Sequence, residues 1–312
     1  MAGTHSKIAM VGAGLVGSTI AYTIAVRNLV SELVIIDINQ EKAEGEALDI
    51  GHGLVALGEM NIHAGTYADI ADSDIIIISA GMGRKPGETR LDLAKKNVGI
   101  IKNITKEIRK YYNGGVRLCV SNPVDIVTYV VQKESGLPKG KVIGTGTSLD
   151  SARFRYLLSE KAGVDVKNVH GFMAGEHGDS QFAVWSSVNI SGMSIDDYCE
   201  ANGISFDKDE LEKAVTLSGA EVIQKKGATY YAIASVAERL CKTILNNQKA
   251  IHHVSCLLDG EYGLHNVCLS LPRVLDVNGI RHTVAYKFTD EELAKLKHSA
   301  AQLQAMIESL EL

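Results

Sequence analysis

The sequence predicts an α/β protein in which a doubly wound parallel sheet is followed by a second, α+β domain. Through the first half of the chain, short apolar strands alternate with helical segments, a pattern typical of parallel sheets with right-handed crossovers. A glycine-rich turn follows the first of these strands directly, and the alternation ends near Asp150. Because 312 residues are many for one domain, we expect two domains, over residues 1–148 and 149–312.

The first half contains four strand signals and three helix signals. The clearest strand is Asp74–Ser79, because its four consecutive isoleucines suit a parallel strand that is buried on both faces. The other strands are expected at Lys7–Val11, Glu32–Asp37 and Val116–Ser121, and the helices at Leu15–Arg27, Glu41–Gly51 and Leu91–Tyr112.

The second half mixes helices with β-rich segments. Thr289 and Glu292 form the capping-box pattern that opens an amphipathic C-terminal helix. Other helices are expected at Ser151–Lys161, Asp207–Lys226 and Tyr230–Asn246, and β-rich segments at Ala183–Ile190 and His252–Leu258.

Composition and charge exclude several classes of function. A net charge of −5 and a pI near 6.1 argue against a nucleic-acid partner, which requires a clustered basic face. No apolar run approaches the ~20 residues that span a membrane, and residues 1–7 do not resemble a secretory signal. The five cysteines are scattered without a C-x-x-C pair, which favours reduced thiols. We therefore expect a cytoplasmic protein.

Residues 12–17 form the dinucleotide signature G-x-G-x-x-G between a strand and a helix. Gly12 allows the tight turn, Gly14 lets the main chain approach a pyrophosphate, and Gly17 brings the helix close to the strand. Asp37 ends the second strand, where its carboxylate can accept both ribose hydroxyls and repel a 2′-phosphate. The sequence therefore predicts an NAD site in a Rossmann domain. Further candidate residues of this site are Tyr67, Ala80, Gly81, Ser121 and Asn122.

A histidine, a carboxylate and an arginine in the second half indicate proton and hydride chemistry on an organic acid. His177 lies between glycines in Gly175–Gly178, and imidazole titrates in the range that a proton donor to a carbonyl requires. Asp150 is a candidate partner for the other ring nitrogen. Arg153, one helical turn later, can bind a carboxylate with two hydrogen bonds. The alternative is a surface-loop histidine and an aspartate that only caps a helix.

Residues 82–93 form a loop with two glycines, a proline, Arg84 and Arg90. The loop follows a buried strand and leads into a long helix. This suits a lid that closes over a site, excludes water and delivers a cation to a reacting carbonyl. Charges on such a loop often form a solvated face, and we keep that interpretation for Lys85.

Several motifs, in one order along essentially the whole chain, resemble those of the L-lactate/malate dehydrogenase family, and specifically its bacterial L-lactate dehydrogenase branch. The matching stretches are Val11–Gly17, Lys85–Leu93, Ser121–Asp125, Leu149–Arg155, Gly175–Asp179 and Lys226–Tyr231. The resemblance implies an NAD-dependent dehydrogenase of 2-hydroxy acids. It also implies that His177 donates the proton, Asp150 orients its ring and Arg153 clamps the substrate carboxylate.

The resemblance assigns four further substrate contacts. It implies that Arg90 polarises the carbonyl, Asn122 hydrogen-bonds near the substrate and Thr229 lines the pocket. Arg84 occupies the position that discriminates substrates, usually glutamine in lactate dehydrogenases and arginine in malate dehydrogenases. With pyruvate a buried Arg84 would lack a partner, at a cost of about 3–5 kcal/mol, so we expect oxaloacetate to be favoured. Thr229 resembles the lactate type, and an Arg84 that reaches solvent would relax the penalty. The alternative is therefore an ordinary L-lactate dehydrogenase acting mainly on pyruvate.

The resemblance also bears on regulation and assembly. Members activated by fructose 1,6-bisphosphate bind its phosphates with an arginine and a histidine from each of two subunits. Arg155 and His170 occupy the matching positions, although Arg155 would equally suit a subunit contact and His170 a strand end. Substrate-driven activation without an effector is the alternative. The resemblance implies a homotetramer, and a dimer would also agree with the sequence.

Two other classes of protein fit parts of the sequence. Tyr129 and Lys133 match the Tyr-x-x-x-Lys of short-chain dehydrogenases, but the chain lacks the glycine loop of that class, so we expect ordinary helix positions. A catalytically silent NAD-binding protein would have lost residues of the histidine site, all of which are present. A metal is not expected, because His252 and His253 would point to opposite sides of a strand and the chain has no HExxH pattern.

Overall fold

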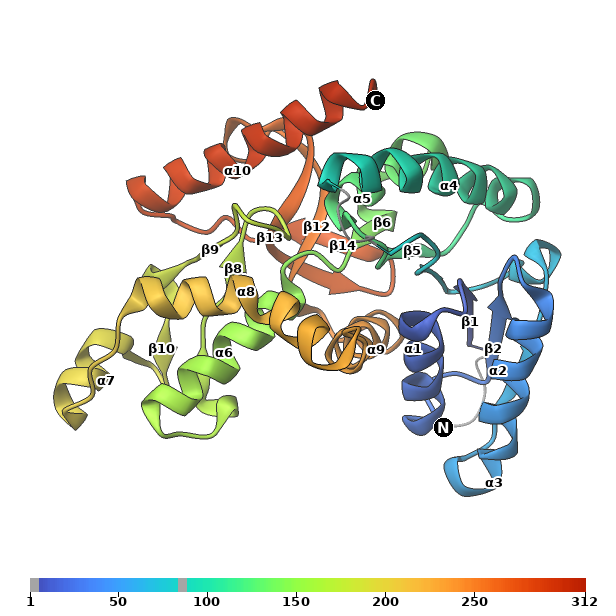
Figure 1. The fold of residues 1–312 in the computed structure, drawn as a ribbon, viewed down its shortest axis with the longest axis horizontal. Helices are drawn as coiled ribbons and strands as arrows, with labels where there is room; N and C mark the ends of the chain where they lie inside the picture. The colour runs from blue at the N-terminus through green and yellow to red at the C-terminus, as the bar shows by residue number, and fades with distance from the viewer. Residues whose placement is uncertain (1–5, 84–88) are drawn as a thin grey trace.

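The computed structural model describes residues 6–83 and 89–312, and it is built around one nine-stranded sheet (Figure 1). The strand order is β14-β13-β12-β6-β5-β4-β1-β2-β3. Strands β1 to β6 are parallel, with β1 between β2 and β4, as in a doubly wound sheet. The predicted fold class is therefore confirmed. The parallel strands are β1 (Lys7–Val11), β2 (Glu32–Ile36), β3 (Asn61–Ala64), β4 (Ile75–Ile78), β5 (Val116–Cys119) and β6 (Val142–Gly144).

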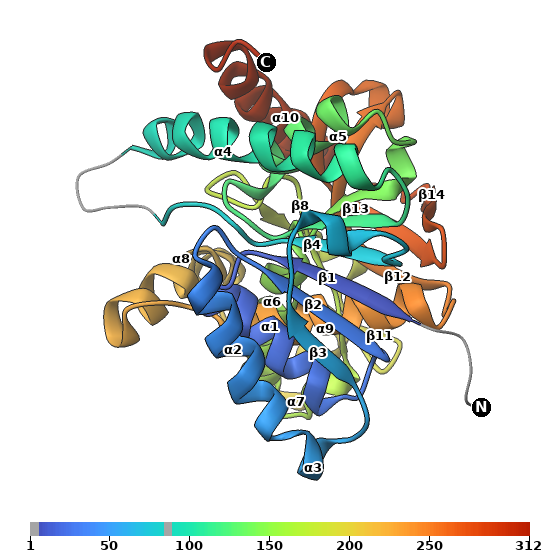
Figure 2. The same ribbon diagram turned by 90° about the vertical axis from the view of Figure 1, so that its right-hand side faces the viewer.

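Helices cover both faces of the parallel strands. They are α1 (Leu15–Val26), α2 (Gln40–His52), α3 (Leu54–Leu57), α4 (Arg90–Tyr111), α5 (Val124–Ser135) and, from the second half, α9 (Tyr231–Leu245), with 3-10 turns η1 (Tyr67–Ile70) and η2 (Lys139–Lys141). In β4, Ile76 and Ile78 belong to the core that contains α4 and α5, whereas Ile75 and Ile77 belong to the core that contains α1, α2 and α9. Figure 2 shows α4 and α5 on one side of the sheet and α1 and α2 on the other. The prediction that this strand is buried on both faces is confirmed.

The second half of the chain extends the same sheet and adds the helices that carry the candidate site. β12 (Ala250–Asp259) pairs antiparallel with β6 at Ser255 and Gly144. Its other edge pairs with β13 (His265–Asp276), which in turn pairs with β14 (Gly279–Thr283). The remaining elements are α6 (Ser148–Ala162), α7 (Ile195–Asn202), α8 (Lys208–Lys226), α10 (Asp290–Ser309), β7 (Val169–His170), β8 (Met173–Ala174), β9 (Phe182–Ala183), β10 (Asn189–Ile190), β11 (Met193–Ser194), η3 (Val166–Asn168), η4 (Trp185–Ser187) and η5 (Glu261–Gly263).

The β-rich segment predicted at Ala183–Ile190 is mostly not strand. Only its two ends are extended, in β9 and β10, and the 3-10 turn η4 lies between them. Trp185 explains the turn, because its ring packs edge-on against Phe154 at 5.1 Å and its indole nitrogen donates to Glu212 at 3.2 Å. These contacts draw the side chain inward and close the chain into a turn, with Val188 N donating to Trp185 O.

The C-terminal helix begins as predicted. Thr289 Oγ1 accepts from Glu292 N at 3.2 Å, and Glu292 Oε2 accepts from Thr289 N at 2.9 Å, which completes the capping box. Among residues 6–83 and 89–312, no helix is long and apolar enough to cross a membrane. All five cysteines are free thiols, four of them buried and Cys199 partly exposed.

Candidate active site

The glycine-rich turn after β1 is shaped by steric contacts at two of its three glycines. Gly12 has φ +105°, and a Cβ there would lie 2.5 Å from Ala80 N. A Cβ at Gly17 would overlap the carbonyl oxygen of Gly12. At Gly14, the N-cap of α1, a Cβ would meet nothing within 4 Å. The turn therefore leaves open space at the amino end of α1, where main-chain amides and the helix dipole favour an anionic group such as a pyrophosphate.

Asp37 lies beside this turn, at the end of β2. Its Oδ2 accepts from Ala13 N at 2.6 Å and its Oδ1 from Asn39 N at 2.9 Å. Burial first, and then the charges of Glu107 and Asp37, raise the pKa of the Tyr67 phenol. The carboxylate and the glycine turn are thus held together, as a dinucleotide site requires.

The ends of β4 and β5 face each other through two polar side chains. Ser121 Oγ donates to Ala80 O at 2.6 Å. Asn97, a fully buried residue of α4, donates to Asn122 O at 2.7 Å and packs within 3.4 Å of the position of a Cβ on Gly81. The four residues predicted at these strand ends are therefore brought together. Asn97 was missed, although a polar residue on the apolar side of a predicted helix is a usable signal.

His177, Asp150 and Arg153 form one connected group. Asp150, in the first turn of α6, is 1% exposed. Its Oδ2 lies 2.5 Å from His177 Nδ1 and its Oδ1 lies 3.1 Å from Arg153 Nη1. Because Asp150 engages Nδ1, the Nε2 atom is the ring nitrogen left to exchange a proton with a substrate.

The charges around His177 favour its protonated form. Burial opposes protonation of the ring, but the charge of Asp150, its hydrogen bond and the charge of Asp125 outweigh burial and raise the pKa of His177. Burial likewise opposes ionisation of Asp150, yet His177 and Arg153 together hold the pKa of this carboxyl below its usual value. A charged carboxylate beside a proton-bearing imidazole is the arrangement that general acid–base catalysis uses.

The main chain of residues 175–177 is held by three different elements. Gly175 N donates to Ser270 O in β13 at 3.2 Å, Glu176 N to Ser299 Oγ in α10 at 2.7 Å, and His177 N to Asp125 Oδ2 in α5 at 2.8 Å. The sequence prediction did not include these three partners as site residues. They come from distant parts of the chain and share no motif with His177.

The guanidinium of Arg153 is enclosed between α6 and α8. Besides its ion pair with Asp150, it lies over Gly219 of α8, where an added Cβ would be 3.5 Å from Arg153 Nη2. The side chain is 15% exposed. This confinement fixes the orientation of the group predicted to bind a carboxylate.

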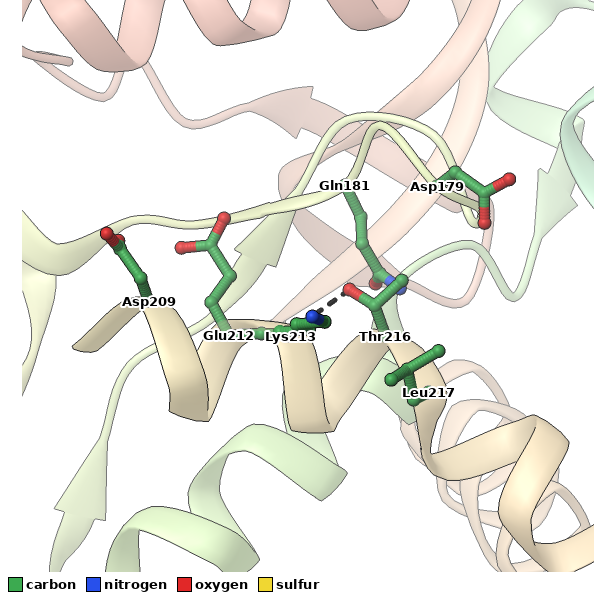
Figure 3. A pocket seen from close by; sticks show the side chains of 7 residues that line it. All are labelled: Asp179, Gln181, Asp209, Glu212, Lys213, Thr216 and Leu217. Atoms are coloured by element: carbon green, nitrogen blue, oxygen red, sulfur yellow. Dashed lines mark hydrogen bonds between the residues drawn. The ribbon is translucent and has the colours of Figure 1, made fainter. Parts of the chain in front are cut away.

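A pocket of about 300 Å³ opens between the segment after His177 and α8 (Figure 3). Glu212, one of its lining residues, accepts a hydrogen bond from Trp185, and burial raises the pKa of its carboxyl. The pocket lies beside the histidine site, and none of the three residues of the His177 group lines it. It is lined by Asp179, Gln181, Asp209, Glu212, Lys213, Thr216 and Leu217.

The structure describes the three remaining predicted substrate contacts to different extents. Arg84 lies outside the described residues, and of Arg90 only the main chain is described, as the first residue of α4. Thr89 caps that helix in a capping box with Asp92. Thr229 is half-buried in the connection between α8 and α9.

Arg155 and His170 lie at one corner of the second half. Arg155 Nε donates to Val169 O at 2.7 Å and Nη2 to Val166 O at 3.2 Å, while the neighbouring His170 is exposed. Burial, together with the charge of Arg239, lowers the pKa of Arg155. Two of the guanidinium nitrogens are thus engaged by main-chain carbonyls.

The remaining candidates lie away from the His177 group. Tyr129 and Lys133 are both bonded to Asn266, at 3.2 and 2.7 Å, as ordinary positions of α5. His252 contacts Thr243 of α9, whereas His253 stacks on Phe172 on the other side of β12. Within residues 6–83 and 89–312, no group of three or more histidine, cysteine, aspartate or glutamate side chains is placed to hold a metal ion.

Comparison with known proteins gives one family over almost the whole chain. The model of the lactate/malate dehydrogenase NAD binding domain matches residues 6–144, and that of the lactate/malate dehydrogenase alpha/beta C-terminal domain matches residues 147–311. The L-lactate dehydrogenase of Acetivibrio thermocellus is 48% identical over 309 residues, 98% of each chain. That of Thermoanaerobacterium saccharolyticum is 46% identical over 311 residues, 98% of this chain and all of that protein. The crystal structure of a lactate dehydrogenase enzyme from a Medee basin deep-sea metagenome library is similar, with a TM-score of 0.95, 41% identity and 99% of each chain covered.

Proposed function

The chain belongs to the lactate/malate dehydrogenase family and is an NAD-dependent oxidoreductase, and from this premise we propose that it is an L-lactate dehydrogenase acting mainly on pyruvate. The observation that carries the proposal is the His177–Asp150–Arg153 group, in which an acid–base histidine and a carboxylate-binding arginine share one buried aspartate. Relatives that are nearly half identical over their whole length carry the name L-lactate dehydrogenase.

The residues divide the work of moving one hydride and one proton. The cofactor, when bound at the glycine turn, would supply a hydride as NADH for reduction or accept one as NAD⁺ for oxidation. Arg153 binds the carboxylate of the keto acid, and His177 Nε2 donates a proton to the carbonyl oxygen as the hydroxyl forms. Asp150 keeps the proton of Nδ1 in place and stabilises the charged ring. In the reverse direction the same nitrogen accepts the hydroxyl proton of L-lactate.

The lid and pocket residues complete the proposed site. We assign Arg90 to the carbonyl oxygen, where a cation stabilises developing negative charge, and Asn122 and Thr229 to the substrate pocket. Asp37 is assigned to the ribose of NAD, because its carboxylate is already fixed beside the glycine turn.

The substrate is the point at which the sequence and the relatives differ. Arg84 led us to expect a preference for oxaloacetate, and the names of the relatives do not support that expectation. We therefore propose pyruvate as the main substrate.

Steady-state oxidation of NADH with pyruvate and with oxaloacetate tests this proposal. We expect kcat/KM for pyruvate to exceed that for oxaloacetate. An Arg84→Gln variant should change the ratio only slightly if Arg84 faces solvent. A wild-type preference for oxaloacetate that reverses in Arg84→Gln would show that Arg84 governs the pocket and would overturn the assignment.

The proposal extends to regulation, assembly and location. We propose a homotetramer in which Arg155 and His170 of paired subunits face fructose 1,6-bisphosphate, as their shared corner permits. Light scattering of the purified protein and the same assay with and without the sugar phosphate test both parts. Activation that is unchanged in Arg155→Gln would remove Arg155 from the effector site. The five free thiols suit the reducing cytoplasm, where we place the enzyme.

A further inference from the structure

Asp125 is a buried carboxylate that contacts the main chain of residues 175–177, the segment that carries His177. It is the second residue of α5 and is 3% exposed. Its Oδ2 accepts the amide hydrogen of His177 at 2.8 Å. Of the three groups that hold the amides of residues 175–177, Asp125 is the one that can ionise, because the others are a main-chain carbonyl and a serine hydroxyl.

Any neutral hydrogen-bond acceptor could accept from the His177 amide. This contact alone therefore does not explain why residue 125 is a carboxylate. Its Oδ1 is buried and has no hydrogen-bond partner among the described residues. Ser255 of β12 is close enough to lower the pKa of Asp125, yet its Oγ also lacks hydrogen-bond geometry with a described partner. An incompletely satisfied buried carboxylate costs stability, and asparagine would make the same amide contact without that cost.

Asp125 and His177 lie close enough for the charge of each to affect the pKa of the other. The titratable groups that face Asp125 are His177 and Glu176 from the loop and Cys268 from β13. Burial raises the pKa of Asp125 to about 7, with Ser255 and the His177 amide acting in the opposite direction. The groups that face His177 are Asp150 and Arg153 of α6 and Asp125 itself.

We propose that Asp125 is a positioning residue for His177, fixing its main chain through one oxygen and stabilising its protonated ring as a second carboxylate. Asp150 sets the orientation and tautomer of the ring from the side of α6, while Asp125 acts on the same residue from α5. Since α5 follows Asn122, which is assigned to the substrate pocket, one segment would support both the histidine and the substrate contact. The inference rests on the proposed function and deepens it.

The test replaces Asp125 by asparagine in the full-length protein. Asp125→Asn keeps the side-chain volume and an oxygen that can accept from His177 N, and it removes the charge. Protonated His177 is required for pyruvate reduction and neutral His177 for lactate oxidation. Reduction therefore falls, and oxidation rises, as the pH increases through the pKa of His177. With Asp125→Asn both limbs of the kcat/KM profiles should move to lower pH by at least about half a unit, while the plateau values fall less than about tenfold.

Two further variants separate a charge effect from a disturbance of α5. Thr128→Val changes a buried polar group one turn away, whose hydroxyl donates to Val124 O within the helix, and both limbs should stay in place. Ser255→Ala removes a neighbour that favours the ionised form of Asp125. It should shift both limbs in the same direction as Asp125→Asn, and it provides the test if the asparagine variant does not fold.

A direct titration makes the result independent of turnover. With ¹³C-labelled histidine, the ring resonance of His177, identified by its loss in His177→Asn, should titrate at lower pH in Asp125→Asn than in the parent. Unmoved limbs and an unmoved titration in Asp125→Asn and Ser255→Ala would overturn the proposal and leave Asp125 as a main-chain contact only. If the parent does not turn over pyruvate, the proposed function fails, and the ring titration still decides the role of Asp125.

Discussion

Replacing Asp150 by asparagine should abolish most of the activity while leaving the fold in place. The variant keeps the size of the side chain but loses the charge that faces both His177 Nδ1 at 2.5 Å and Arg153 Nη1 at 3.1 Å. For a carboxylate and an imidazolium about 4 Å apart at an effective dielectric constant of about 20, the Coulomb energy is about 4 kcal/mol. Breaking a buried pair costs about 3–5 kcal/mol, which agrees with this figure.

That energy converts into a measurable loss of rate. At about 1.4 kcal/mol per factor of ten, a loss of about 3–4 kcal/mol in stabilising the charged histidine predicts a decrease in kcat of roughly 10²- to 10³-fold. The asparagine also removes the support that raises the pKa of His177. The descending limb of pyruvate reduction should therefore move to lower pH. The KM for pyruvate should rise as well, because Arg153 loses its anchor.

The assay is steady-state NADH oxidation across pH 5–9, with NADH affinity measured separately by fluorescence. An exposed aspartate gives the matched control: Asp165→Asn changes the cap of η3, where the side chain accepts from Lys167 N, and should leave kcat and the limb unchanged. A loss of less than about threefold in Asp150→Asn, or a limb that does not move, would refute the reasoning. Loss of NADH affinity would instead indicate that the domain had rearranged.

Three further predictions concern the cofactor turn, the cofactor choice and the enclosure of Arg153. Gly17→Ala should lower the Tm by several degrees, because the new Cβ overlaps the carbonyl of the turn. Gly14→Ala, where the Cβ meets nothing, should keep the Tm and weaken NADH binding; equal Tm losses would contradict this contrast. Asp37→Asn should weaken NADH binding and raise the ratio of NADPH to NADH use in kcat/KM, and an unchanged ratio would argue against its ribose role. Gly219→Ala should be tolerated and raise stability by up to about 1 kcal/mol in urea unfolding, whereas Gly219→Leu should displace Arg153 and raise the KM for pyruvate; similar KM values in the two variants would contradict the proposed enclosure.

Four of the six parallel strands, β1, β2, β4 and β5, were predictable because each is a short, mostly apolar run between turns. Their observed ends differ from the prediction by no more than two residues, as in β4, where Ile75–Ile78 replaces the expected Asp74–Ser79. The missed strands each lack that signal. β3 is polar and only partly buried, as an edge strand can be, and β6 has three residues. In β13, Pro272 interrupts an apolar run, and proline argues against a strand, although its carbonyl still accepts from Val284 N.

The candidate site likewise combines residues that lie within one motif with residues that only the fold brings together. The glycine turn and the Asp150–Arg153 pair each lie within one short stretch of sequence, so the sequence could indicate that their residues act together. The three acceptors that hold residues 175–177 lie up to 123 residues from the amide that they bind. They lie in three different elements, α5, β13 and α10, and the sequence alone does not indicate which buried polar groups will meet.

In the proposed mechanism, binding of an acid substrate would also favour the protonated form of His177. In the free protein, Asp150 and Asp125 favour the protonated ring, whereas Arg153 opposes it. A substrate carboxylate bound to Arg153 neutralises that opposing charge, and the two aspartates then act on His177 without it. The same arginine that orients a keto acid would therefore increase the protonation of the histidine that must reduce it. An uncharged ketone would gain neither effect, so in the proposed mechanism charge favours 2-keto acids.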